Sequence, residues 1–455
     1  MSFDLPVLPQ GWSYVPLEQL AHKNSVTYGV VQPGSHVGHG IPIVRVNNFK
    51  DGRIELTELM RVEPEIESKY GRTRLQGGEV LLTLVGSVGQ VAVVPETLKG
   101  FNVARAVAVI HPQEVDPNWL AICLRSPLSQ HLLSSRANTT VQTTINLKDL
   151  RALPVPIAPQ HERERIIELI GSLDDRITLL RETNVTLESI GQALFKSWFV
   201  DFDPVRAKSA GLEPEGMDAA TAALFPDSFE ESELGLVPRE WRVDRADCWL
   251  SVLETGRRPK GGVSGIMDGV PSIGAESIVR IGAFDYSKTK YVSAEFFEKM
   301  KSGGLQSHDV LLYKDGGKPG VFLPRVSMFG DGFPFEKCGI NEHVFRIRLK
   351  EPFNQAFLYY WLWSDAVMHE LRHRGGKAAI PGINQTDVKE LKLLVPDKHV
   401  LMRFDEITSP LINTIFSNSK QAQTLTQLRD TLLPRLISGQ LRLPEAEAQL
   451  EEVCA

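Results

Sequence analysis

The chain has 455 residues, of which 42% are apolar and 23% are charged, and its formal net charge is −6. One hydrophobic core rarely serves more than about 300 residues, so we expect at least two domains. The near balance of charges excludes a strongly basic protein, and net charge alone therefore argues against a nucleic-acid partner.

The negative charge is concentrated in one segment. Residues 203–236 hold two basic side chains, Arg206 and Lys208, and eight acidic ones. The rest of the chain is therefore electrically neutral and can carry local basic patches. Simple solubility explains near-neutral domains equally well.

The four cysteines are scattered and form no Cys-x-x-Cys pair, which argues against structural zinc and against a disulfide framework. The N-terminal residues lack the basic stretch and the apolar core of a signal peptide. The longest apolar run, Val80 to Val94, is broken by glycines, so it predicts two strands and a turn instead of a membrane span. We therefore expect a cytoplasmic protein.

The first predicted domain covers residues 1–158 and is mixed α/β. Strand-like alternation begins at Ile41. Residues 79–85 and 90–94 predict a hairpin around Gly86–Gly89. Helical apolar spacing runs from Trp119 to Leu133, and a polar loop follows.

A long helix is predicted over residues 159–202. Apolar residues recur there at alternating spacings of four and three for more than four heptads, which indicates a coiled coil. Asn184 is a polar member of this seam, a common device for fixing register. The seam consists of Ile166, Ile170, Leu173, Ile177, Leu180, Asn184, Leu187, Gly191, Leu194 and Trp198.

An acidic linker, residues 203–236, leads to a second mixed α/β domain over residues 237–395. Its predicted elements are a hairpin, a helix and a polar loop, as in the first domain. They are expected at Val310–Tyr313 with Val321–Leu323, at Ala356–Leu371, and at residues 372–384.

A second long helix is predicted over residues 396–440, followed by a C-terminal tail over 441–455. Its seam is diluted by Thr408, Asn418, Ala422 and Arg429, and Pro434 should kink or end it near Leu433. We expect the two long helices to pair as an antiparallel coiled coil. The alternative is that each helix packs separately on its own domain.

The second half of the chain repeats the first. Leu75–Leu82 matches Leu305–Leu312 at an offset of 230 residues, and Ile145–Leu150 matches Ile383–Val388 at an offset of 238. The predicted fold is therefore α+β, with two similar domains alternating with two long helices in a pseudo-two-fold internal repeat. A covalent pseudo-dimer suits a two-fold partner such as duplex DNA.

The two polar loops are the first candidates for DNA contact, because Arg, Lys, Asn and Gln side chains do most of the reading of base edges. They occupy the same place in each repeat but differ in chemistry, as readers of different half-sites should. The candidates are Arg136, Gln142, Thr143 and Asn146 in the first loop and Arg372, Arg374, Lys377 and Asn384 in the second. For Asn146 and Asn384 we favour a simpler role, capping the helices that follow.

The hairpin turns are secondary candidates, for phosphate contact. They comprise Gly86–Gly89 in the first domain and Lys314 with Lys318 in the second, and a plain turn explains them equally well. Weaker candidates are Arg45, Asn47, Asn48, Arg257, Arg258 and Lys260.

Four aromatic residues lie at the end of the first long helix. Phe195, Trp198, Phe199 and Phe202 either form a docking surface for another subunit or pack within the coiled coil.

Two segments resemble a known family. Ala193–Lys208 resembles the central region of type I restriction–modification specificity subunits, and Leu432–Leu441 resembles the end of their second helix. Together with the order of domains and helices, the resemblance covers nearly the whole chain. It implies a subunit that does no chemistry, reads a bipartite asymmetric DNA target and docks two methyltransferase subunits and motor-nuclease subunits. S-adenosylmethionine, ATP and Mg are then expected on those partners and none on this chain.

Catalytic motifs are missing from the sequence. There is no P-loop, and Asp203-Pro-Val-Arg206 lacks the second proline and the aromatic residue of an adenine methyltransferase. Asp387, Glu390 and Lys392 have nuclease-like letters but are too crowded, and His161-Glu162 lacks the second histidine of a zinc site. Two alternatives remain open: a self-sufficient DNA-modifying enzyme and a coiled-coil scaffold that binds only proteins.

Overall fold

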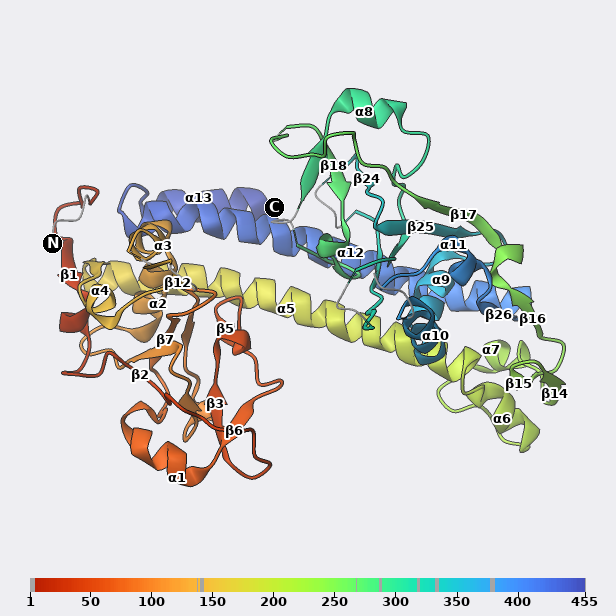
Figure 1. The fold of residues 1–455 in the computed structure, drawn as a ribbon, viewed down its shortest axis with the longest axis horizontal. Coiled ribbons are helices and arrows are strands. Elements are labelled where there is room, and N and C mark those ends of the chain that lie inside the picture. The colour runs from red at the N-terminus through yellow and green to blue at the C-terminus, as the bar shows by residue number, and fades with distance from the viewer. Residues whose placement is uncertain are drawn as a thin grey trace. The chain divides into compact units, whose positions relative to one another are not determined.

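A computed structural model describes residues 5–136, 138–139, 143–266, 268–285, 289–316, 320–331, 335–376 and 381–454. Contacts divide the chain into two compact units. Unit 1 comprises Met1–Asp175 with Leu425–Ala455, and unit 2 comprises Arg176–Thr424. Each unit combines small sheets with short helices, and two helices of 40 residues each, α5 (Gln160–Phe199) and α12 (Lys398–Ile437), contribute to both (Figure 1).

Unit 1 is built on a four-stranded sheet of order β2-β10-β7-β8 and a three-stranded sheet of order β6-β3-β9. The predicted hairpin is confirmed, because β7 and β8 pair antiparallel with Val80 opposite Val93. The strands are β1 (Ser13–Pro16), β2 (Thr27–Tyr28), β3 (Ile41–Val44), β4 (Phe49–Lys50), β5 (Arg53–Ile54), β6 (Met60–Val62), β7 (Val80–Thr83), β8 (Val91–Val93), β9 (Asn102–Val103), β10 (Val107–Ile110), β11 (Asn138–Thr139), β12 (Thr143–Thr144) and β13 (Pro154–Ile157).

The helix expected over 119–133 is two helices. Ser126 ends the first and caps the second, where its side chain accepts a hydrogen bond from the Ser129 backbone N–H at 3.2 Å. Pro127 then takes the first helical position, where its missing N–H costs nothing. The helices of unit 1 are α1 (Pro64–Glu67), α2 (Pro117–Arg125), α3 (Pro127–Ser134), α4 (Leu147–Arg151) and α13 (Leu443–Cys454).

Unit 2 contains a four-stranded sheet of order β17-β25-β22-β23 and a three-stranded sheet of order β21-β18-β24. The expected strand at Val321–Leu323 is wrong: β22 pairs instead with β23, which begins at Val326. Val321 and Leu323 are largely exposed, so they lack the burial that a core strand needs. The strands are β14 (Phe229–Ser232), β15 (Gly235–Pro238), β16 (Arg242–Arg245), β17 (Leu250–Thr255), β18 (Val270–Ile273), β19 (Ile278–Arg280), β20 (Ala283–Phe284), β21 (Lys290–Val292), β22 (Val310–Tyr313), β23 (Val326–Met328), β24 (Gly339–Ile340), β25 (Val344–Leu349) and β26 (Lys392–Val395).

The sheets of the two units follow one plan. In each, the four-stranded sheet is antiparallel, and the three-stranded sheet pairs its middle strand antiparallel on one side and parallel on the other. In each, a short hairpin follows that middle strand, formed by β4 with β5 and by β19 with β20. The first strand of each unit's α/β region also pairs with its last, β1 with β13 and β16 with β26.

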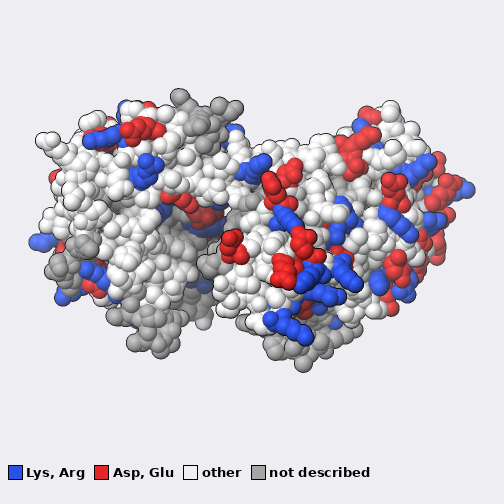
Figure 2. All heavy atoms as spheres, turned by 90° about the horizontal axis from the view of Figure 1, so that it is seen from above, with Lys and Arg blue, Asp and Glu red and all other residues white. Residues whose placement is uncertain are grey.

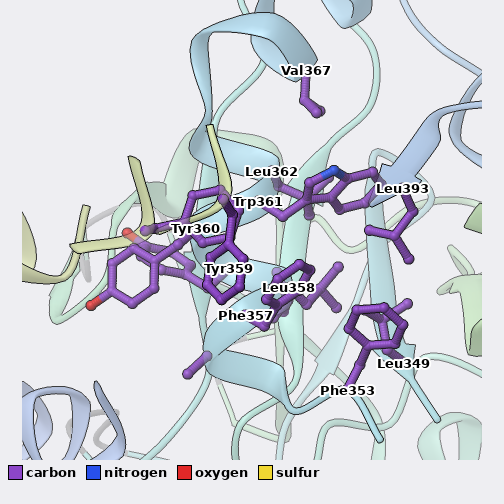
Figure 3. Close-up of a cluster of buried hydrophobic side chains, with 14 of the residues drawn as sticks. Leu349, Phe353, Phe357, Leu358, Tyr359, Tyr360, Trp361, Leu362, Val367 and Leu393 are labelled. Atoms are coloured by element: carbon purple, nitrogen blue, oxygen red, sulfur yellow. The ribbon is translucent and has the colours of Figure 1, made fainter. Parts of the chain in front are cut away.

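The core of unit 2 is aromatic. Helix α9 (Gln355–Trp363) buries Phe357, Tyr359, Tyr360 and Trp361, and Figure 3 shows the two tyrosines on one side of this helix and Leu393 on the other. The expected helix over 356–371 is again two, because Ser364 separates α9 from the next helix. The other helices here are α6 (Asp203–Ser209), α7 (Ala219–Ala223), α8 (Ala294–Lys299), α10 (Asp365–Gly375) and α11 (Gln385–Lys389).

The long helices contact each other in each unit. In unit 2, Asn184 of α5 bonds to Ile415 of α12, and Phe195 packs on Phe404, so the contacts run in antiparallel order. In unit 1, Asp174 pairs with Arg429 at 2.7 Å. Pro434 does not end α12 near Leu433, because the helix continues to Ile437, and the positive-φ Gly439 follows two residues later.

The acidic segment 203–236 has secondary structure of its own. It contains α6, α7 and most of the β14–β15 hairpin. Phe225 and Val205 of this segment are buried in the core of unit 2.

Candidate nucleic-acid interface

The structure brings the two predicted DNA-contact segments of unit 1 together. The turn after β7 lies beside the polar loop of residues 136–146: the Gly86 N–H donates to the carbonyl oxygen of Thr143 at 3.2 Å, and Val85 forms a β-bridge with Thr144. A third bond runs from the Ile145 N–H to the Leu84 carbonyl oxygen at 3.0 Å. Segments about 60 residues apart in the chain thus form one edge.

Unit 2 repeats this juxtaposition. The Ile383 N–H donates to the Lys314 carbonyl oxygen at 2.7 Å. This bond is equivalent to the one from Ile145 to Leu84, because its donor lies 238 residues and its acceptor 230 residues further along the chain, which are the two offsets of the internal repeat. Asp315 forms a β-bridge with Gly382, and the Gly316 N–H donates to the Pro381 carbonyl oxygen at 2.8 Å. Each unit therefore places a hairpin turn and a polar loop side by side.

The turn of the first hairpin is shaped by its own side chains. Thr83 Oγ1 accepts from the Gln90 N–H at 2.9 Å and donates to the Ser87 carbonyl oxygen. Gly86 and Gly89 have φ values of 80° and 85°, which residues other than glycine rarely adopt. The turn is therefore held in one conformation without using Ser87 or Val88 side chains.

Asn146 and Asn384 cap helices, and this favoured interpretation is confirmed. The Asn146 side-chain oxygen accepts from the Asp149 N–H at 2.8 Å, at the start of α4. The Asn384 oxygen accepts from the Thr386 N–H at 2.7 Å, at the start of α11. Both side chains remain exposed.

Arg374 is not the unpaired loop side chain that we expected. It lies in the last turn of α10, and its guanidinium pairs with Glu370 at 2.5 Å and Glu390 at 3.1 Å. Arg372, one half-turn earlier, is exposed. Of these two arginines, Arg372 is the better placed to meet a phosphate or a base.

Lys314 is partly engaged. Its ammonium lies 2.9 Å from the Asp315 carboxylate and 5.7 Å from the centre of the Phe345 ring. Asp315 also contacts His343 Nδ1 at 2.5 Å. An approaching phosphate would have to compete with Asp315 for this ammonium group.

The remaining predicted residues have mixed outcomes. Gln142, Lys318 and Lys377 lie outside the described residues. Arg136 follows α3 and is half-buried, and Thr143 belongs to β12. Asn48 is a wrong candidate, because its side chain is buried and donates to the Thr57 carbonyl oxygen at 3.2 Å.

Two polar pockets contain residues that the sequence analysis missed or ranked low. A pocket of about 380 Å³ in unit 1 is lined by Asn24, Thr27, Tyr28, Tyr70, Arg72, Leu147 and Arg151. Leu147 follows Asn146 directly, so this pocket adjoins the polar loop. A pocket of about 190 Å³ in unit 2 includes Arg257, Arg258 and His343, and His343 contacts Asp315 of the candidate turn. No spacing in the sequence links these residues, because separate strands and loops supply them.

Comparison with known proteins shows what the chain is similar to. Residues 9–189 match the type I restriction modification DNA specificity domain. The chain is 34% identical over 199 residues to the specificity subunit of the type I restriction enzyme EcoBI from Escherichia coli, an alignment that covers 41% of the chain and 42% of that subunit. It is 26% identical over 415 residues to the HindI specificity subunit from Haemophilus influenzae, with 78% of the chain and 84% of that subunit covered. The chain is therefore similar to type I restriction–modification specificity subunits, over residues 9–189 by the family match and over most of its length by the HindI alignment.

A solved structure supports the fold. The S subunit of a type I restriction–modification system from M. genitalium aligns with 95% of the chain and 98% of its own length, with a TM-score of 0.51 and 13% identity. At that identity the likeness concerns the fold alone.

The aromatic residues at the end of α5 are core residues of unit 2. Phe195, Trp198, Phe199 and Phe202 are each at most 9% exposed. Phe199 packs on Phe404 of α12 with ring centres 5.1 Å apart. The docking role predicted for these four side chains is therefore wrong, because side chains buried in the core cannot contact another subunit.

Charges on the surface of the protein are mixed. Figure 2 shows Lys and Arg next to Asp and Glu on the drawn face, with no large area of a single sign. Among the described residues, no three His, Cys, Asp or Glu side chains are grouped to hold a metal ion, and no helix there is long and apolar enough to cross a membrane.

Proposed function

We propose that this chain is the DNA sequence-specificity subunit of a type I restriction–modification complex. Its two α/β domains, residues 1–158 and 237–395, each read one half of a bipartite asymmetric target. The supporting observation is that both units place a hairpin turn beside a polar loop through an equivalent hydrogen bond, while the side chains on those loops differ. An equivalent backbone arrangement that carries different side chains in each unit suits the recognition of two different half-sites.

The long helices, within residues 159–202 and 396–440, form an antiparallel coiled coil that separates the two domains. A helix of about 35 residues spans about 50 Å, and neighbouring major-groove faces on one side of DNA lie about 34 Å apart. The pair is therefore long enough to hold the domains over successive grooves. Residues 203–236 link the first long helix to the second domain, and residues 441–455 form the C-terminal tail.

The chain itself does no chemistry in this proposal. Two methyltransferase subunits and motor-nuclease subunits bind to it and carry S-adenosylmethionine, ATP and Mg, in the cytoplasm. The exposed apolar residues of α5, Leu179, Val185 and Ile190, are better candidates for subunit docking than the buried aromatic residues.

The test is selection of binding sites from randomised duplex DNA by the full-length protein. Two conserved half-sequences at a fixed separation are expected, with affinity that falls as salt rises. Lys314→Ala should weaken all sequences alike and flatten the salt dependence, because a phosphate contact carries no sequence information.

The same full-length protein and duplex DNA distinguish the proposed function from the two alternative functions. Transfer of a labelled methyl group to DNA by the lone protein would support a self-sufficient modifying enzyme. A protein that binds no duplex at low salt would support a scaffold that contacts only proteins.

A further inference from the structure

The interface between α5 and α12 in unit 2 contains a buried polar network. Asn184 Nδ2 donates to the Ile415 carbonyl oxygen at 3.1 Å and to Ser419 Oγ at 3.0 Å. Asn418 Nδ2 donates to Asn184 Oδ1 at 3.0 Å. Asn184 and Ser419 are each only 8% exposed, so these bonds replace water that cannot reach them.

One helical turn further along α5 is a buried carboxylate. Glu188 is 1% exposed. Its Oε2 accepts from Arg280 Nε at 2.5 Å, and its Oε1 accepts from the Tyr359 hydroxyl at 2.5 Å. Burial, reinforced by the neighbouring Glu188 charge, raises the pKa of Tyr359, so this hydroxyl stays a donor.

Both the Asn184–Ser419 network and the Glu188 carboxylate contact the same hairpin, at Arg280, the last residue of β19, and at the turn residues Ile281 and Gly282 before β20. Ser419 Oγ lies 2.8 Å from the Gly282 carbonyl oxygen and 2.6 Å from the Ile415 carbonyl oxygen, so its single hydroxyl proton is shared between these two acceptors. The Ile281 N–H lies 3.4 Å from the Tyr359 hydroxyl oxygen. The turn is therefore bound by side chains from α5, α9 and α12.

The fit at Gly282 is close. Its φ is 68°, and a Cβ atom there would lie 2.5 Å from both Ile415 Cγ2 and Ser419 Oγ. Only glycine permits this approach of the turn to α12. The hairpin cannot slide along the helix without losing these contacts.

We propose that Glu188 and Ser419, one from each long helix, are positioning residues that fix the second recognition domain along the helices and thereby set the separation of the two half-sites. The inference rests on the proposed function. A buried ion pair adds little net stability compared with an apolar pair, and its best-attested use is to select one arrangement among similar ones. The same set of hydrogen bonds fixes the register between the two helices and attaches the second domain to them.

The experiment removes the turn's polar anchors and leaves the helix seam in place. Arg280→Met keeps the aliphatic stem but loses the bond to Glu188, and Ser419→Ala loses the hydroxyl that reaches Gly282. Each variant and the double variant are made in the full-length protein and used to select sites from randomised duplex DNA. Ser417→Ala is the matched control, because Ser417 is exposed two positions away on the same helix.

The wild-type protein and Ser417→Ala are expected to select one separation between the half-sequences. The double variant should select the same half-sequences at several neighbouring separations, with preference for the wild-type separation reduced about tenfold, as from the loss of a single buried hydrogen bond to a charged group. Arg280→Lys, which keeps the charge, should broaden the distribution less. A purely structural role would lower affinity or stability and leave the separation unchanged.

A folded double variant that selects a single, unchanged separation would overturn the proposal. Should the double variant not fold, Ser419→Ala alone must still broaden the distribution, and an unchanged distribution overturns the proposal equally. If the wild-type protein selects no two-part sequence, the proposed function itself fails and this inference with it.

Discussion

The hydroxyl oxygen of Tyr360 lies 2.1 Å from the position that a Cβ atom on Gly191 would occupy. Gly191 lies in the C-terminal part of α5, and Tyr360 projects from α9. The sequence pattern gave Gly191 a place in the apolar seam of the helix. Its real role is to let the domain's tyrosine approach the helix backbone.

Gly191→Ala is therefore expected to destabilise the protein, although alanine is the better helix former. Overpacking costs about 1–3 kcal/mol, which exceeds the gain of about 1 kcal/mol from helix propensity. The measurement is urea unfolding. Gly171→Ala is the control, because nothing lies within 4 Å of its Cβ position, and it should be stabilising. In a Tyr360→Leu background the cost of Gly191→Ala should shrink, and an undiminished cost would show that the ring is not its cause.

Asp174 joins two arginines in unit 1. Its carboxylate lies 3.1 Å from Arg125 Nη1 and 2.7 Å from Arg429 Nη1, and it is only 20% exposed. Asp174→Asn should lower the free energy of unfolding by about 1–3 kcal/mol, because two charged donors lose their acceptor. The neighbouring Asp175, 79% exposed and paired with Arg53, provides the comparison. Asp175→Asn should cost about 0–1 kcal/mol, and equal losses in the two variants would contradict this account.

Glu67 makes the stability of unit 1 depend on pH. Hydrogen bonds from Arg74 hold the pKa of Glu67 below its ordinary value of 4.5, against the opposing effect of burial, and Asn102 lowers it further. A lowered pKa stabilises the folded state above pH 4.5, and this stabilisation is lost as the pH falls through the folded value. Glu67→Gln should therefore cost about 1–3 kcal/mol at pH 7. In urea titrations the wild type and the variant should converge below pH 4.5, and a constant difference would contradict the assignment.

The two arginines of α10 should behave differently. Arg372→Ala is expected to weaken specific DNA binding by about 1–3 kcal/mol and to relax discrimination at one position. Arg374→Ala should mainly lower stability, because its guanidinium is held by Glu370 and Glu390. Binding titrations beside thermal unfolding separate the two effects. Loss of specificity in Arg374→Ala with unchanged unfolding would reverse the assignment.

Periodicity predicted the elements that local spacing controls. The long helices and the hairpin of β7 with β8 follow from apolar spacing, and both asparagine caps follow from their position before a helix. The β22 hairpin was misassigned because Val321 and Leu323 have strand-like letters, whereas burial selects Val326. Pro434 was expected to end α12 because it removes one backbone hydrogen bond, yet the helix continues for three more residues.

Contacts between segments that are distant in the chain could not be predicted from the sequence. Arg429 was expected to weaken the helix seam, yet Asp174 on α5 neutralises it. Phe195 and Phe199 looked available for docking, and only the fold shows that α9 and α12 cover them. Arg374 pairs with Glu370 of its own helix, but a second acidic partner, Glu390, lies sixteen residues away, just after α11. In each case at least one partner comes from outside the residue's own helix.

The length of the two long helices is the central quantity of the proposed function. Deleting Arg176–Glu182 from α5 and Lys420–Thr426 from α12 removes one heptad from each and preserves the seam. Both deletions spare Asn184, Glu188 and Ser419. The helices should shorten by about 10 Å.

The decisive measurement is site selection by this double-deletion protein from randomised duplex DNA. At about 3.4 Å for each base pair, the separation between unchanged half-sequences should shrink by about three base pairs. A folded double-deletion protein that selects the original separation would show that these helices do not set the distance.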